Sequence, residues 1–158
     1  MTKSSLPSSF SSSFLLVLLV LSLVWIRSSF TKWASGAFAA TLGETLTKFA
    51  SKNPYPWFKD FLENVAIPNS QLFGLLTIWG ETFAAWGSAL ALLYLLWKKE
   101  PQKWAVVLLL GSLVVGAFLN LIFWLASGWT SPSADSLNLL MFLIQSIGIF
   151  FTLKLVRS

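Results

Sequence analysis

Four long apolar runs divide the chain, and each is long enough to cross a lipid bilayer as a helix. A helix needs roughly 20 mostly apolar residues to span about 30 Å of hydrocarbon. The runs predict spans over Phe10–Trp33, Gln71–Trp97, Trp104–Ser127 and Ser136–Val156. The pattern therefore predicts an all-α integral membrane protein, in which one domain over residues 1–158 forms a bundle of four transmembrane helices.

The segment between the first two runs, Ala34–Ser70, mixes charged residues with aromatic ones. Three apolar residues recur there at helical spacing with polar residues on the opposite side, namely Leu42, Leu46 and Phe49 against Glu44, Thr47 and Lys48. Such a helix suits the membrane surface. The sequence "NPYP" at 53–56 ends it, and a second short apolar face follows. We predict an amphipathic, interfacial cap between helices 1 and 2; the alternative is a lid over a site.

Composition supports a membrane protein and excludes several kinds of chemistry. Hydrophobic residues make up 56% of the chain and charged residues 11%, whereas a soluble domain carries about 25% charge. The sequence contains no Cys and no His. It therefore has none of the usual ligands for zinc, iron–sulfur clusters or haem, and it has no dinucleotide-binding fingerprint. Any redox chemistry is expected to use a diffusible carrier or the cofactor of a partner, because the sequence has no metal, haem or flavin motif.

Positive charge predicts which side of the membrane each end of the bundle faces. The connection "KKEPQK" at 98–103 holds three Lys and one Glu, whereas residues 128–136 hold no Lys or Arg. The positive-inside rule places the basic connection and both termini in the cytoplasm, with the cap on the other side of an inner or internal energy-converting membrane. The first run also resembles a secretory signal, but its continuation into "RSSFTKW" favours an uncleaved helix.

Glu81 is the residue in the spans that packing alone explains least well. A charge at the bilayer centre costs roughly 2.5–3.5 kcal/mol, and Glu81 lies roughly 15 Å below the start of its helix. We expect Arg27 to contact it, both residues being catalytic, with Asn120 and Gln145 satisfying the remaining polar groups; a purely structural ion pair is the alternative. The small residues on the same helix faces are expected to serve helix packing, among them Ser22, Ser112, Gly116 and Gly148.

A second set of polar residues is predicted at the outer mouth of the bundle. We expect a set of seven residues to bind substrate: Lys32, Asn120, Trp129, Thr130, Ser131, Asn138 and Gln145. Ser133 or Asp135 is expected to cap the fourth helix. An apolar pocket with few polar groups suits a lipid-soluble molecule with a polar head, such as a quinone, with which Glu81 could exchange a proton.

The sequence resembles the DoxX/DoxD family, whose members include the membrane subunit of thiosulfate:quinone oxidoreductases. The resemblance covers about Val24–Thr152 and rests on "RSSFTKWASG" at 27–36, "NPYPWFKDFL" at 53–62, "IPNSQLFGLLTIWGE" at 67–81 and "NLIFWLASGWTSPSADSLNLLMF" at 120–142. It implies a four-helix membrane protein linked to electron transfer into the quinone pool. It also implies that the Arg27/Lys32 pair, Gly80–Glu81 and the turn at Trp129–Asn138 occupy the family's recurrent polar positions. Ser28–Phe30 depart from the family, which commonly has a small residue or Gly there.

Three functions remain open from the sequence. The first is a DoxX-like subunit of a quinone-linked oxidoreductase, with quinone as a diffusible substrate and a polar site open to the non-cytoplasmic face. The second is a non-catalytic accessory subunit of a larger energy-converting complex, which the absence of Cys, His and cofactor motifs favours. The third is a small transporter, for which four helices without a repeat are thin support. The expected partners are the lipid bilayer and other membrane subunits, and no nucleic acid.

The predicted topology places the two ends of the bundle on opposite sides of the membrane. Single cysteines introduced at Gln102 and Ser133 should therefore react with a thiol reagent from opposite sides, because the chain has no Cys of its own. The measurement is labelling of intact cells with an impermeant maleimide, which should reach only Ser133→Cys. Labelling of both variants in intact cells would contradict the topology.

Overall fold

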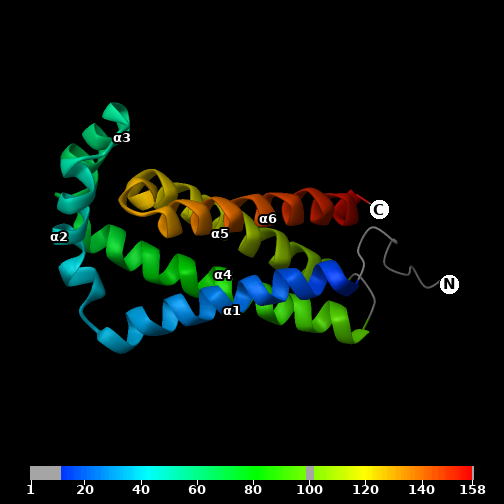
Figure 1. Ribbon diagram of the computed structural model, residues 1–158. Helices are drawn as coiled ribbons and strands as arrows, with labels where there is room; N and C mark the ends of the chain where they lie inside the picture. The colour runs from blue at the N-terminus through cyan, green and yellow to red at the C-terminus, as the bar shows by residue number, and fades with distance from the viewer. Residues whose placement is uncertain (1–11, 99–101, 158) are drawn as a thin grey trace.

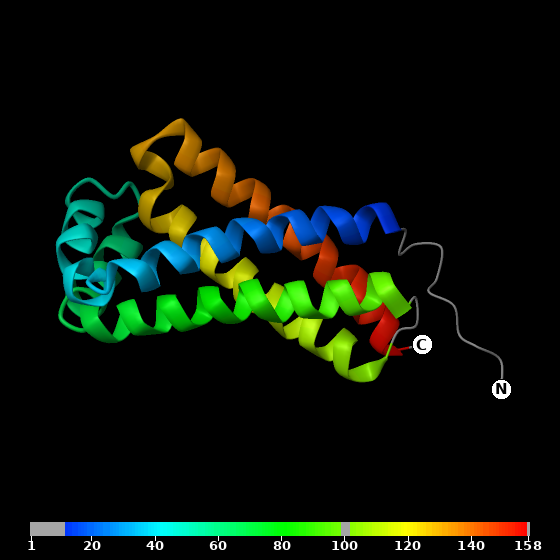
Figure 2. The same cartoon turned by 90° about the horizontal axis from the view of Figure 1, so that it is seen from below.

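The computed structural model describes residues 12–98 and 102–157, and within these ranges the chain forms helices without a β-strand. Four long helices make the body of the molecule (Figures 1 and 2): α1 (Ser12–Ser35), α4 (Ser70–Lys98), α5 (Lys103–Ser127) and α6 (Pro132–Arg157). The shorter elements are α2 (Phe38–Ser51), α3 (Pro56–Phe61), the π-helical turn η1 (Leu62–Ala66) and the 3-10 turn η2 (Gly128–Thr130). The start of the first predicted span at Phe10, and Lys3, Lys99 and Glu100 of the charge pattern, lie outside the described residues.

Three helical stretches among the described residues are long and apolar enough to cross a membrane. They are Ser12–Ser35, Lys103–Thr130 and Pro132–Val156. These stretches identify an all-α, multi-pass membrane protein. Helix α4 is as long as they are but is not among these stretches, and Glu81 and several small or polar residues interrupt its apolar sequence. The fourth span is therefore a prediction that rests on its length and on its packing.

Helix α4 packs between α1 and α5, and α5 packs along α6. The interior is formed by large apolar side chains that are almost completely buried, among them Leu15, Leu18, Leu92, Leu95 and Leu109. Small and hydroxylated residues let the helices approach closely, as predicted. The hydroxyl of Ser88 donates to that of Ser22 at 2.9 Å between α4 and α1. Gly116 leaves room for the Gln145 amide between α5 and α6.

The segment between α1 and α4 folds over one end of the bundle, on the left in Figure 1 and opposite the C-terminus. The apolar residues Leu42, Leu46 and Phe58 are buried and cluster with Ala126 of α5, while Glu44 and Lys48 are exposed. The predicted amphipathic pattern of α2 is therefore confirmed. Its apolar face, however, is buried against the bundle end rather than left free for the membrane surface, because α4 and α5 offer it an apolar partner there.

Two glycines position this cap. Gly36 has a φ of 63°, a left-handed conformation that glycine adopts without steric cost, and it separates α1 from α2. Gly74 lies in a close contact between α2 and α4, since a Cβ added there would lie 2.6 Å from the Cα of Ala39. The close approach of the cap therefore requires a residue without a side chain at position 74.

Gly74→Ala should loosen the cap. The added methyl group meets backbone that cannot rotate away, and overpacking of this kind costs roughly 1–3 kcal/mol. Gly111→Ala is the matched control, because its Cβ would meet only the ring of Phe83 at an ordinary 3.6 Å. Thermal unfolding in mild detergent should show a lower melting temperature for the first variant alone. Equal melting temperatures would contradict the close α2–α4 contact.

Candidate functional site

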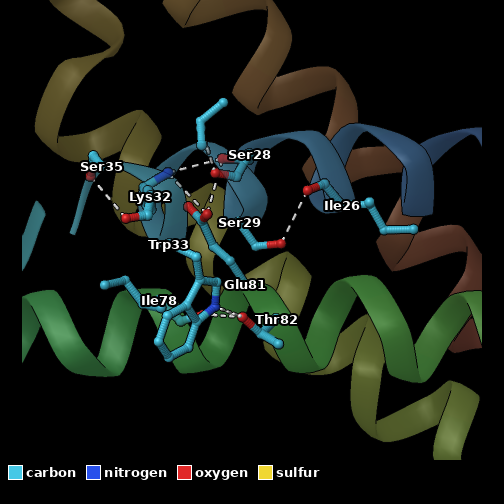
Figure 3. A network of polar contacts seen from close by, with 10 residues as sticks. Ile26, Ser28, Ser29, Lys32, Trp33, Ser35, Ile78, Glu81 and Thr82 are labelled. Atoms are coloured by element: carbon cyan, nitrogen blue, oxygen red, sulfur yellow. Dashed lines mark hydrogen bonds and ion pairs between the residues drawn. The ribbon is translucent and has the colours of Figure 1, made fainter.

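Glu81 lies in the contact between α1 and α4 and is the centre of a buried polar network (Figure 3). Its side chain is completely buried, whereas that of Lys32 is 18% exposed. The Nζ atom of Lys32 lies 2.9 Å from Oε2 of Glu81. Ser28 Oγ donates to the same oxygen at 3.0 Å and accepts from Lys32 Nζ at 2.9 Å. Ser28, Lys32 and Glu81 thus form a closed triad, named the Glu81 triad below.

Helix periodicity explains why these three residues meet. Ser28 and Lys32 are four residues apart, so they lie on one face of α1. Because α1 and α4 run antiparallel, that face meets Glu81 while Ser22 meets Ser88 further along the two helices. Lys32 also has its Nζ 5.1 Å from the ring centroid of Phe38, the first residue of α2. The lysine therefore joins α1, α4 and the cap.

The predicted contact between Arg27 and Glu81 is wrong. The side chain of Arg27 is exposed, and Glu81 is paired with Lys32 instead. The physical reason is the helix period: Arg27 precedes Ser28 by one residue, which turns it about 100° away from the face that meets α4. The spacing of Trp25, Ser29 and Lys32 is the signal that points to Lys32, because all three lie on one side of α1.

Two buried polar atoms have no hydrogen-bond partner among the described residues. They are Oε1 of Glu81 and Nε1 of Trp25. Buried polar atoms are nearly always paired, so each exception calls for an explanation. Oε1 of Glu81 is a hydrogen-bond acceptor, and Nε1 of Trp25 is a donor. Glu81 therefore keeps one oxygen available for hydrogen bonding or for a proton, even though its other oxygen is fully engaged.

Asn120 and Gln145 bond to each other rather than to Glu81. Asn120 Nδ2 donates to Gln145 Oε1 at 2.7 Å, and both side chains are buried between α5 and α6. The two amides therefore satisfy part of each other's hydrogen-bonding capacity. Among the described residues, neither amide forms a hydrogen bond with Glu81, which was their predicted role. Both residues are in the bundle interior as expected.

Two tryptophans lie beside the Glu81 triad on the outer side of α1 and α4. Trp33 Nε1 donates to Thr82 Oγ1 at 2.9 Å, and the rings of Trp33 and Trp79 meet edge to face with centroids 5.2 Å apart. Both rings are about half exposed, at 49% and 61%. The triad is thus flanked by an aromatic surface that faces away from the protein.

The turn before α6 is built differently from the prediction. Ser131 Oγ accepts from the backbone N–H of Ala134 at 3.1 Å, so Ser131 caps α6 and Pro132 is its first residue. Asp135 lies in the first turn and instead accepts from Trp124 Nε1 at 2.6 Å. The prediction of Ser133 or Asp135 as the cap is therefore wrong, and α6 begins four residues earlier than Ser136. Asn138 donates to Ala134 O at 2.8 Å within the helix.

A pocket of about 440 Å³ lies between this turn and the cap. The structure brings three predicted binding residues together in its lining, Trp129, Thr130 and Ser131, and adds Tyr55, Trp124, Gly128, Pro132 and Asp135. Lys32, Arg27 and Asn138 do not line it. The pocket and the Glu81 triad therefore share no residue, although the sequence suggested a single site. Tyr55 was missed because its cap segment is far from the turn in the sequence.

Comparison with protein-family models, with curated proteins and with solved structures found no match. The fold and composition thus define the class, a multi-pass α-helical membrane protein, and the likeness to the DoxX/DoxD family stays a prediction. In the described ranges, no three His, Cys, Asp or Glu side chains gather where they could hold a metal ion.

Lys32→Met should destabilise the protein because it leaves the carboxylate of Glu81 buried without a counter-charge. Losing one partner of a fully buried pair costs roughly 3–5 kcal/mol, and the 18% exposure of Lys32 reduces the loss here. The second substitution Glu81→Gln should restore most of the stability, since no buried charge then remains. Chemical unfolding of the two single variants and the double variant measures this coupling. Arg27→Met is the control and should have little effect.

Proposed function

We propose that this protein is a DoxX-like membrane subunit of a quinone-linked oxidoreductase, in which Glu81 exchanges protons with the quinone head. The observation that carries the proposal is a fully buried carboxylate with one oxygen fixed by Lys32 and Ser28 and the other without a hydrogen-bond partner among the described residues. A buried carboxylate inside a membrane protein is a mark of ion or proton handling.

The surroundings of Glu81 suit a polar head on an apolar molecule. The Lys32 ammonium has three N–H donors, of which Ser28 and Glu81 engage two. The third can donate to a quinone oxygen, and Glu81 supplies a group that gives up or accepts a proton. Trp33 and Trp79 offer exposed ring surface beside the triad. The ring of a quinone would pack against the two tryptophans from the bilayer, with its oxygen directed at Lys32.

The reaction needs an electron source outside this chain. Reduction of a quinone to a quinol takes up two electrons and two protons. If the donor is thiosulfate, two anions join through a new S–S bond to form tetrathionate and release the two electrons. The chain has no Cys and no His, so the proposal assigns to it the quinone and the protons, and assigns the transfer of electrons from the anion to a partner subunit.

One observation favours the accessory role as a second candidate. Large apolar side chains are exposed on all four long helices, among them Phe30, Trp86, Phe118 and Phe150. Lipid covers such surfaces, and so do neighbouring subunits. In that case the Lys32–Glu81 pair would serve only to hold α1 to α4.

Glu81→Gln distinguishes the two roles. The variant keeps the size of the side chain and one oxygen that can accept from Ser28 and Lys32, but it does not take up or release a proton near neutral pH. Quinone reduction by the purified assembly in lipid vesicles should fall at least about a hundredfold, which is a typical contribution of general acid–base catalysis. Glu44→Gln, on the exposed face of the cap, is the matched control and should keep full turnover.

Wild-type turnover in Glu81→Gln would overturn the proposal. The accessory role would be established by two results together. The unaltered protein would be inactive by itself but purify in fixed proportion with a larger complex, and that complex would keep its activity when Glu81 is replaced.

A further inference from the structure

We infer that the pocket between the cap and the start of α6 binds an organic cation, namely an ammonium head group. The site is separate from the Glu81 triad and does not depend on the proposed quinone reaction. The charge of its lining argues for a cation, because the lining contains Asp135 and no Lys or Arg.

Aromatic rings from separate parts of the chain form the walls of this pocket. Tyr55 comes from the residue before α3, Trp124 from the last turns of α5 and Trp129 from η2. The rings of Tyr55 and Trp124 have centroids 6.0 Å apart and are tilted by 42°. Aromatic faces gathered in this way attract cations, and quaternary ammonium groups are their characteristic ligands.

Three side-chain hydrogen-bond donors of the lining are engaged within the protein. Trp124 Nε1 donates to Asp135 Oδ1, and Trp129 Nε1 donates to Ala126 O at 3.0 Å. Thr130 Oγ1 donates to Ser127 O at 2.6 Å. The hydroxyls of Tyr55 and Ser131 are the side-chain donors of the lining that have no acceptor among the described residues. An anion would therefore find two hydroxyl donors and no Lys or Arg, whereas a cation would meet three aromatic rings and Asp135.

Asp135 is the charged residue of the lining, and no Lys or Arg is among the lining residues. Its Oδ1 is held by Trp124, which leaves Oδ2 without a hydrogen-bond partner among the described residues. The N-terminus of α6 contributes a positive charge of only about one half, which the full negative charge of Asp135 exceeds. In a chain of formal charge +5, this pocket is thus locally negative.

Asn53 lies beside the pocket and positions one of its walls. Its side chain is nearly buried, at 9% exposure. Its Nδ2 donates to Leu125 O at 3.0 Å, and its Oδ1 accepts from the backbone N–H of Tyr55 at 3.0 Å. Asn53 therefore fixes Tyr55 against the end of α5. The volume of about 440 Å³ falls within the range of small-molecule sites, roughly 300–1,000 Å³.

The test compares choline with its neutral carbon isostere, which has the same shape but no charge. Calorimetric titration of the purified protein in phosphatidylglycerol nanodiscs should show choline binding at least about fivefold more tightly than the isostere. Sodium acetate should show no binding. Equal affinity for choline and the isostere, preference for acetate, or no choline binding would each overturn the inference.

Two matched substitutions tie the binding to the pocket. Asp135→Asn removes the charge but keeps an oxygen for the Trp124 N–H, and it should weaken choline binding about fivefold or more. Tyr55→Leu should weaken it as well, whereas Tyr55→Phe keeps the aromatic face and should bind normally. Glu81→Gln should also bind normally, which separates this site from the quinone proposal. Unchanged binding in both Asp135→Asn and Tyr55→Leu, with normal melting temperatures, would contradict the assignment.

Addition of phosphatidylcholine to the nanodiscs distinguishes two sources of the ammonium group. If the natural ligand is a lipid head group, phosphatidylcholine should compete with soluble choline for the pocket. If it is a soluble amine, the affinity for choline should be the same in both kinds of disc. Either result supports a cation site and identifies its source.

Discussion

The ion pair between Lys32 and Glu81 is the interaction on which the arrangement of this protein depends. A carboxylate in the middle of an apolar bundle is costly unless a cation and hydrogen bonds accompany it. Lys32 and Ser28 meet that need from one face of α1, so they fix the position of α1 along α4. Because the Lys32 amine also lies near the ring of Phe38 at the start of α2, the same interaction ties the bundle to its cap.

The chemistry of the molecule gathers at the capped end. The Glu81 triad lies inside the contact between α1 and α4, and the aromatic pocket lies at the junction of the cap with α5 and α6. The cap contributes Phe38 beside the first and Tyr55 to the second. It therefore acts as more than a cover, since it supplies part of each site. On the two proposals above, the protein handles protons in its interior and a cationic head group at its capped end.

Much of the fold could be predicted from the sequence because long apolar runs indicate membrane helices. The bounds of α4 and α5 agree with the predicted spans to within one residue. The sequence predicts too late a start for α6 because Ser131, Ser133 and Asp135 offer competing caps, and only the three-dimensional turn shows that Trp124 engages Asp135. The apolar face of α2 was assigned to the membrane surface because the sequence does not reveal a partner at the bundle end.

The candidate site was predictable in its residue types but not in its pairing. The sequence identifies Glu81 because a charged carboxylate within an apolar run is costly in a membrane and is therefore expected to have a partner or a function. Similar depth in the membrane predicts Arg27 as the partner of Glu81. The contact is decided instead by the direction in which each side chain leaves its helix. Lys32 is five residues closer to the end of α1 but lies on the correct face, and its long side chain reaches back to Glu81. Tyr55 could not be assigned to the pocket, because the contact requires knowing how the cap folds back.

The most direct measurement of the central claim is the dipolar coupling between the Glu81 carboxyl carbon and the Lys32 Nζ nitrogen, by solid-state NMR of selectively labelled protein in lipid. The ion pair at 2.9 Å predicts a strong coupling to Lys32, which disappears in Lys32→Met, and no coupling to the Arg27 guanidinium. A strong coupling to Arg27, or none to Lys32, would contradict the account.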